Sequence, residues 1–158
     1  MPELFEAAGS HVIDSLVEAL ETMAFISSMP GERSAAAPEH PRLVGVDFTA
    51  PRRGTIRLMA DQSFGATLAA NLIGVDPQSP EAQACADDAL MELLNVTCGS
   101  AIRKLGHADD QRLHMSLPSI HPVTTSGQWN QFLNRPNVFV LDAEGQIIAL
   151  EAIGLEPR

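Results

Sequence analysis

Basic residues, cysteines and long apolar runs are all scarce in this sequence. The 10 lysines and arginines stand against 20 aspartates and glutamates, which gives a formal charge of -10. A nucleic-acid surface needs clustered basic side chains, so this balance argues against nucleic acid as a partner. No apolar run approaches the length of a membrane span, and the first residues lack the basic and apolar regions of a signal peptide. We therefore expect a cytoplasmic protein with no membrane partner.

Cysteine is limited to Cys85 and Cys98. If both lie on one helix, the rise of about 1.5 Å per residue separates them by about 20 Å, which is far beyond the reach of a disulfide. We expect both thiols to be reduced. A chain of 158 residues can bury a sizeable core without disulfides or metals, and we expect one domain over residues 1–158.

The most informative segment is Pro80–Leu105, for which we predict a single helix. At about 100° per residue, its acids, its amide and a glycine gather in one narrow polar stripe. The opposite side is apolar and suits a core. The stripe contains Asp88, Glu92, Asn95 and Gly99, and the apolar side contains Leu90, Leu93, Leu94, Thr97, Ala101 and Leu105.

Three apolar residues flank this stripe: Met91, Val96 and Ile102. Single exposed apolar side chains are common on protein surfaces, but three beside a group of polar residues indicate a docking surface. We therefore expect these residues, with Asp88 and Gly99, to contact a partner.

The spacing along the helix carries a family resemblance. Asp88 is followed by Glu92 four residues later, by Asn95 three residues after that, and by Pro118 a further 23 residues on. This pattern resembles the signature of the CheC/CheX/FliY chemotaxis phosphatases, and the chain is most similar to a CheX-like member over residues 79–126. The resemblance implies an enzyme that removes the phosphoryl group from the phospho-aspartate of a CheY-type response regulator, with Glu92 and Asn95 as its catalytic residues and Pro118 in a structural role.

The residue types suit that chemistry. Hydrolysis of an acyl phosphate passes through a loose, in-line transition state, in which positioning the attacking water matters more than deprotonating it. The Asn95 amide can donate and accept hydrogen bonds without placing negative charge beside the phosphoryl group. The resemblance further implies that Glu92 pairs with the regulator's active-site lysine, an ion pair that would fix the docked geometry.

This hypothesis also explains why position 99 is a glycine and which protein binds the metal. A glycine inside a helix costs roughly 1 kcal/mol relative to alanine, and its lack of a side chain would let a partner's backbone come close. The Mg²⁺ of such a reaction belongs to the regulator's acidic site, so we expect this chain to bind no cofactor or metal of its own.

A function of another class stays open. A glutamate and an asparagine three residues apart also occur on ordinary solvated helix faces. A domain of the same fold could bind a response regulator, or form part of a flagellar switch, without catalysis. Binding alone would require the same exposed face.

The remaining segments predict an α/β (α+β) fold, in which two long helices and one shorter helix pack on a largely antiparallel sheet. Proline interrupts one expected strand, and Asp-Ala-Glu-Gly forms the turn of one expected hairpin. The expected helices are 4–28, 61–73 and 80–105, the strands 43–49, 55–60, 114–121, 137–142 and 146–153, and the loops 30–42, 106–111 and 122–136, of which the first and last should be mobile. The apolar final strands should leave an edge for a possible homodimer.

Other candidate sites are weaker. Asp14, Glu18 and Glu21 repeat the motif spacing, but a carboxylate replaces the amide, so we expect one active site per chain. Cys98 lies mid-helix without an adjacent base, which disfavours a nucleophile and favours a core position. His107, His114 and His121 lack the acidic or cysteine partners of a metal site. Trp129 should anchor its loop in the core, which is a commoner role for such a residue than marking a contact.

Overall fold

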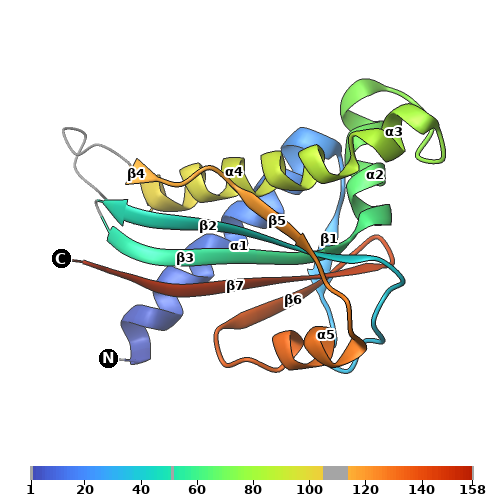
Figure 1. The fold of residues 1–158 in the computed structure, drawn as a ribbon. Coiled ribbons are helices and arrows are strands. Elements are labelled where there is room, and N and C mark those ends of the chain that lie inside the picture. The colour runs from blue at the N-terminus through green and yellow to red at the C-terminus, as the bar shows by residue number, and fades with distance from the viewer. Residues whose placement is uncertain (1, 51, 105–113, 158) are drawn as a thin grey trace.

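The structure is a computed structural model that describes residues 2–50, 52–104 and 114–157. Its described strands form one seven-stranded antiparallel sheet with the order β1-β6-β7-β3-β2-β4, and β5 pairs with β2 beside β4 (Figure 1). The strands are β1 (Ser28–Pro30), β2 (Pro41–Ala50), β3 (Arg52–Asp61), β4 (His114–Met115), β5 (Ser119–Pro122), β6 (Val138–Ala143) and β7 (Gln146–Pro157). The helices are α1 (Pro2–Ala24), α2 (Gln62–Ile73), α3 (Pro80–Ala84), α4 (Ala86–Lys104) and α5 (Ser126–Leu133).

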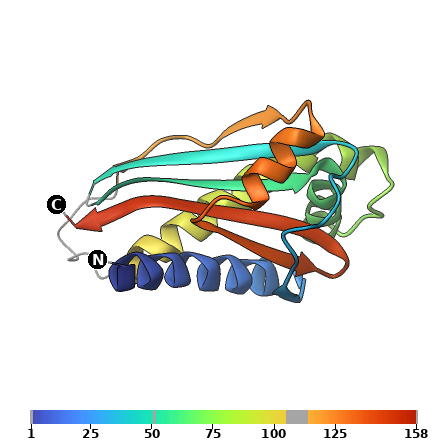
Figure 2. The ribbon, with the colours of Figure 1, turned by 90° about the horizontal axis from the view of Figure 1, so that it is seen from below.

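Different helices pack on the two faces of the sheet. Alternate side chains of a strand point to opposite faces, so Val44 and Val46 enter one core while Leu43 faces the other way. We call the face packed against α1, α2 and α4 the inner face, and the face partly covered by α5 the outer face. In Figure 2, α5 crosses in front of the strands and α4 passes behind them. The sheet therefore separates two surfaces of the molecule.

The predicted mixed fold with an antiparallel sheet is confirmed, as are its capping signals. Asp61 caps α2 by accepting a hydrogen bond from the Ser63 backbone N–H, and Gly74 ends the helix with φ 73°. The β6–β7 hairpin turns at Glu144 and Gly145, both with positive φ, as a two-residue turn requires. The break at Pro118 is confirmed too, because β4 and β5 pair separately with β2.

The predicted single helix over 80–105 is wrong. It divides at Cys85, whose φ of -96° and ψ of 1° end α3 before α4 begins. The first helix is also shorter than predicted, because it ends at Ala24 and Ser28 already belongs to β1. Leu105 and the predicted loop 106–111 lie outside the described residues.

The two segments that we expected to be mobile loops are held in place. The first carries Arg33, whose guanidinium donates hydrogen bonds to the carbonyls of Leu133, Arg135 and Val138. The second contains α5, which begins with a capping box between Thr125 and Gln128. Long-range contacts therefore order both segments.

Trp129 joins these two segments, and its predicted anchoring role is confirmed. Its side chain is fully buried, and its indole Nε1 donates a hydrogen bond of 3.1 Å to the carbonyl of Ala35. With Phe132, Leu133 and Met59 it forms the core of the outer face.

The expectation of a free edge at the final strands is also wrong. β7 lies between β6 and β3, and β6 pairs with β1. Beyond that pairing, the Gly31 N–H donates a hydrogen bond to the Val140 carbonyl of β6. The Arg33 guanidinium donates one to the Val138 carbonyl of the same strand. These groups blunt the edge that a second copy would need. In the described part of the chain, no helix has the length and apolar character to cross a membrane.

Gly65 sets the distance between α2 and α4. A Cβ atom there would lie 2.5 Å from the Ala86 carbonyl oxygen and 3.0 Å from Leu90 Cγ. We expect Gly65→Ala to lower the free energy of unfolding by about 1–3 kcal/mol, because the backbone of α4 must move away. Urea denaturation followed by circular dichroism measures this change, and an unchanged or raised stability would contradict the close packing.

Candidate functional site

The polar stripe lies on α4. The first turn of this helix carries Asp87 and Asp88, and its last turn carries Arg103 and Lys104, so charges at both ends complement the helix dipole. The predicted apolar side is confirmed at its described positions. Leu90, Leu93, Leu94, Thr97 and Ala101 are buried, and Cys98 lies among them. Burial of this side leaves the stripe at the surface.

The motif side chains have no polar partners in the part of the chain that the structure describes. Asp88 and Glu92 are exposed, and Asn95 is half-buried. Among the residues that the structure describes, none of these three side chains forms a hydrogen bond or an ion pair. By contrast, the neighbouring Asp87 pairs with Arg42 of β2, with Nε and Oδ1 3.4 Å apart. The fold thus assigns a structural contact to Asp87 and leaves the other three polar groups available.

The flanking apolar residues differ from one another. Val96 is 36% exposed, and Met91 is half-buried against the core. Ile102 is fully buried, so its assignment to an exposed docking surface is wrong. The physical reason is that α1 packs along the end of α4, where Lys104 Nζ lies 2.7 Å from Glu18 Oε2.

Gly99 is half-buried and has open space where a side chain would be. A Cβ atom at this position would have Arg103 Nη1 as its nearest neighbour, at the ordinary contact distance of 3.9 Å. Unlike Gly65, Gly99 meets no close neighbour among the described residues that would explain why it lacks a side chain.

Pro118 lies half-buried between β4 and β5, and β5 also contacts α4.

The repeat of the motif spacing in α1 has a structural explanation. Glu18 forms the ion pair with Lys104, and the hydrogen bond and charge of that lysine lower the pKa of the Glu18 carboxyl group. Glu21 is exposed on the same helix and supplies no amide. We therefore retain one candidate site, on α4.

The other reactive side chains do not gather into a second site. No group of three histidines, cysteines or acids within 2–50, 52–104 and 114–157 could hold a metal. His114 and His121 are exposed on separate strands, and His107 lies outside the described residues. Both cysteines are free thiols.

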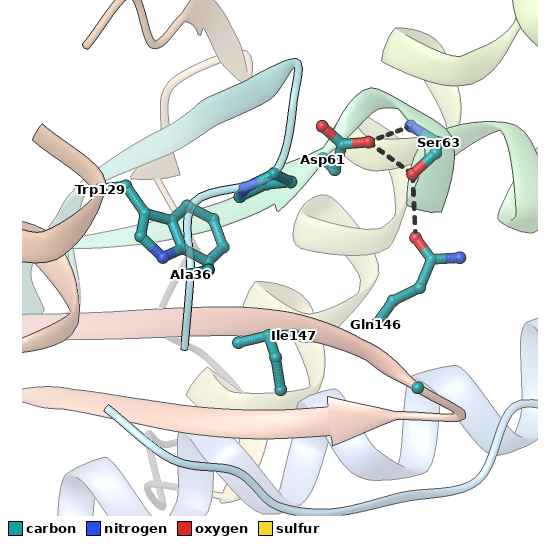
Figure 3. Close-up of a pocket in the computed structure, with 8 residues that line it drawn as sticks. Ala36, Asp61, Ser63, Trp129, Gln146 and Ile147 are labelled. Carbon is teal, nitrogen blue, oxygen red and sulfur yellow. Dashed lines mark hydrogen bonds between the residues drawn. The ribbon is translucent and has the colours of Figure 1, made fainter. Parts of the chain in front are cut away.

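A hollow of about 270 Å³ lies near the start of α2 (Figure 3). Its polar side chains form hydrogen bonds within the fold. Asp61 accepts hydrogen bonds from the Ser63 N–H and hydroxyl and from the His40 N–H. The Ser63 hydroxyl also lies 3.1 Å from Gln146 Oε1. These bonds fasten the helix cap, and they leave the Asp61 carboxylate occupied.

Sequence reasoning missed one charged cluster altogether. Glu151 of β7 is only 2% exposed, and it contacts Arg57 and Arg135 on the outer face. The available signal was a glutamate within the otherwise apolar run Ile147–Ile153. A buried acid in such a strand requires a basic partner.

The fold defines a class of protein. The structure of CheX from Vibrio vulnificus is 19% identical, with a TM-score of 0.63, and the match covers 91% of this chain and 96% of that one. The CheX–CheY–BeF₃–Mg²⁺ complex from Borrelia burgdorferi contains a similar chain, 18% identical with a TM-score of 0.60, covering 93% and 97%. Thermotoga maritima FliY is 15% identical with a TM-score of 0.59, covering 98% and 91%. The chain thus has the CheC/CheX fold.

The family assignment is narrower. The model of the chemotaxis phosphatase CheX family matches residues 43–125, which is more than half of the sequence and includes all of α4. The chain belongs to this family. A comparison with curated proteins gives no match.

The open space at Gly99 leads to a stability prediction. Gly99→Ala should raise the free energy of unfolding by up to about 1 kcal/mol, because alanine has the higher helix propensity and meets no clash. Urea denaturation of this variant beside Gly65→Ala provides a matched comparison of one substitution in two environments. Destabilisation by Gly99→Ala would mean that the glycine has a packing role.

Cys98 should be chemically silent. Burial raises the pKa of its thiol to about 12, so at pH 8 it stays almost wholly protonated and lacks the reactive thiolate form. We expect iodoacetamide to label the half-exposed Cys85 first and Cys98 only on unfolding. Peptide mass spectrometry over a time course measures both rates, and equal labelling in the folded protein would contradict the burial.

Proposed function

We propose that this chain hydrolyses the aspartyl phosphate of a CheY-type response regulator. The observation that carries the proposal is the stripe of α4, where the side chains of Glu92 and Asn95 are accessible and form no hydrogen bond or ion pair within the described chain. The chain belongs to the chemotaxis phosphatase CheX family, and an amide beside a carboxylate suits such a reaction, because the amide can position a water molecule and the carboxylate can pair with a basic group of the partner. We place the reaction in the cytoplasm.

Asn95 orients the attacking water in this proposal. Its carboxamide oxygen accepts a hydrogen bond from the water, and its NH₂ group can donate one to a phosphoryl oxygen. Because the residue is half-buried on a rigid helix, few rotamers are open to it once a partner covers the stripe. The water is then held in line with the breaking P–O bond, and the aspartate carboxylate leaves.

Glu92 positions the regulator. It lies one turn before Asn95 on the same stripe, and its exposed carboxylate can reach a lysine at the rim of the regulator's phosphorylation site. Covering that ion pair with the docked partner reduces solvent screening, so the pair fixes the orientation of the complex more than it adds to affinity.

Gly99 and Val96 complete the docking surface. The space above Gly99 admits a partner's backbone to the helix surface, and the partly exposed Val96 adds apolar contact beside it. The Mg²⁺ bound by the regulator's acidic residues offsets the charge on the phosphoryl oxygens. This chain needs to supply no metal ligand.

The choice of partner rests on the similar proteins. The Borrelia burgdorferi structure contains a CheX chain together with CheY, BeF₃ and Mg²⁺. A regulator of the CheY type is therefore the partner class that we infer for the α4 surface of this chain.

A non-catalytic interaction domain is the second candidate. The similarity to the middle domain of FliM from Vibrio alginolyticus favours it, at a TM-score of 0.52. Such a domain would present the same stripe to a regulator and leave its phosphate intact. The two functions differ in what Asn95 does.

Asn95→Ala should therefore abolish hydrolysis and preserve docking. We expect the added rate of regulator dephosphorylation to fall by at least about a hundredfold, because the water loses its positioning group. The measurement is the decay of the phosphorylated regulator alone, with the wild-type chain and with the variant. Binding to the regulator with BeF₃ and Mg²⁺ should change little.

Two further variants sharpen this experiment. Asn95→Asp has the same shape but adds a negative charge that repels the phosphoryl group, so it should also be inactive. Asn130→Asp makes the same change on exposed α5 and should act as wild type. Acceleration by Asn95→Ala at the wild-type rate would refute the role of Asn95, whereas binding without acceleration by the wild type would establish the interaction domain.

A further inference from the structure

The outer face carries a buried carboxylate between two arginines. Glu151 of β7 lies opposite Arg57 of β3 in the sheet register, with Oε1 3.4 Å from Arg57 Nε. Arg135, just before β6, donates from Nη1 to both carboxylate oxygens, at 3.2 and 3.1 Å. Glu151 is 2% exposed, whereas the two arginine side chains are 34% and 45% exposed. The acid is thus covered while both bases reach the surface.

Stability alone does not account for this cluster. An ion pair taken out of water recovers little net energy, and apolar side chains of similar size serve as well or better in most cores. Here one carboxylate holds two guanidinium groups, so the cluster keeps a formal charge of +1 in a chain whose total is -10. A local positive charge fixed in a strongly acidic protein favours an anionic ligand.

Both arginines retain unused hydrogen-bond donors. A guanidinium has five N–H groups, and Arg57 reaches Glu151 through Nε while Arg135 uses Nη1. The remaining N–H groups of these two side chains meet no acceptor in the part of the chain that the structure describes. Arg135 is further fixed by the Phe132 ring, whose centroid lies 5.8 Å from its Cζ. The donors are held in place before any ligand arrives.

These donors border a hollow of about 330 Å³, within the size range of small-molecule sites. We call it the outer hollow. Arg57 and Arg135 form its cationic part, and Leu43, Met59 and Phe132 form an apolar part. An adjoining hollow of about 270 Å³ shares Arg57 but contains the Asp47 carboxylate. Repulsion by Asp47 therefore places an anionic group on the Arg135 side.

We propose that the outer hollow binds a small organic anion. Its phosphate or carboxylate oxygens accept hydrogen bonds from Arg57 and Arg135, since the guanidinium fork matches either group. Its apolar or aromatic body packs on Leu43, Met59 and Phe132. The site lies on the outer face and the α4 stripe does not contribute to it, so this proposal is independent of the phosphatase activity.

Phenyl phosphate, benzoate and inorganic phosphate serve as probes, with benzyl alcohol as an uncharged control. We expect saturable shifts in ¹H–¹⁵N spectra at Leu43, Arg57 and the residues of α5 with phenyl phosphate, benzoate or both, and weaker binding of inorganic phosphate. The stronger of the two organic probes identifies the acid group. If neither phenyl phosphate nor benzoate saturates the shifts at about 10 mM, the proposal is overturned, because a dissociation constant above that concentration means negligible binding.

Charge variants locate the binding. Gln131→Glu adds a negative charge at the outer hollow, and Asn130→Asp adds one a single residue earlier on α5, outside it. Both positions are exposed, so both variants should fold. We expect at least about tenfold weaker binding for Gln131→Glu alone. Equal affinities in these two variants would place the anion elsewhere and refute the site.

Arginine variants test the donors directly. Arg135→Gln should weaken binding at least about tenfold, whereas Arg53→Gln, on β3 outside the hollow, should leave it unchanged. A thermal unfolding scan shows whether Arg135→Gln still folds. If it does not, the comparison of Gln131→Glu with Asn130→Asp tests the site. Unchanged affinity in folded Arg135→Gln would refute the proposal.

Discussion

The burial of one side of α4 against the sheet is the constraint on which the candidate site depends. Leu90, Leu93, Leu94 and Cys98 are all enclosed in the inner core, so the helix cannot rotate without exposing them. At about 25 cal/mol per Å² of apolar surface, exposing even two leucines would cost several kcal/mol. The orientation of Glu92 and Asn95 therefore follows from packing on the far side of the helix. Gly65 reinforces it by letting α2 approach the backbone of α4.

Local signals in the sequence identified the elements that depend on short-range chemistry. The 3.6-residue period located the main part of α4, and the cap residues Asp61 and Gly74 gave the limits of α2. The polar stripe was predictable because helical spacing alone decides which residues share a side. The family resemblance then gave those residues a chemical meaning that the period cannot supply.

Long-range contacts explain what the sequence did not reveal. Arg33 fastens its segment to carbonyls about 100 residues away, and nothing in a run of alanine, proline and charge indicates those partners. Ile102 is buried in the core that α1 and α4 share, and helical periodicity cannot foresee this packing. The start of α5 did carry a local signal, Thr125 with Gln128 in a capping box, but it stands within a polar segment that resembles a loop.

Gly65 on α2 and Gly99 on α4 show why environment, more than residue type, indicates function. Gly65 has no room for a methyl group, so packing within the chain explains it. Position 99 has room for a side chain, yet it holds a glycine, which weakens a helix. The Asn95 amide, which has no hydrogen-bond partner among the described residues, lies one turn away on the same side. Departures from local stability that no internal contact offsets are typical of sites shaped for another molecule. On α4 they coincide on the one stripe that the core leaves uncovered, which is why we place the partner there.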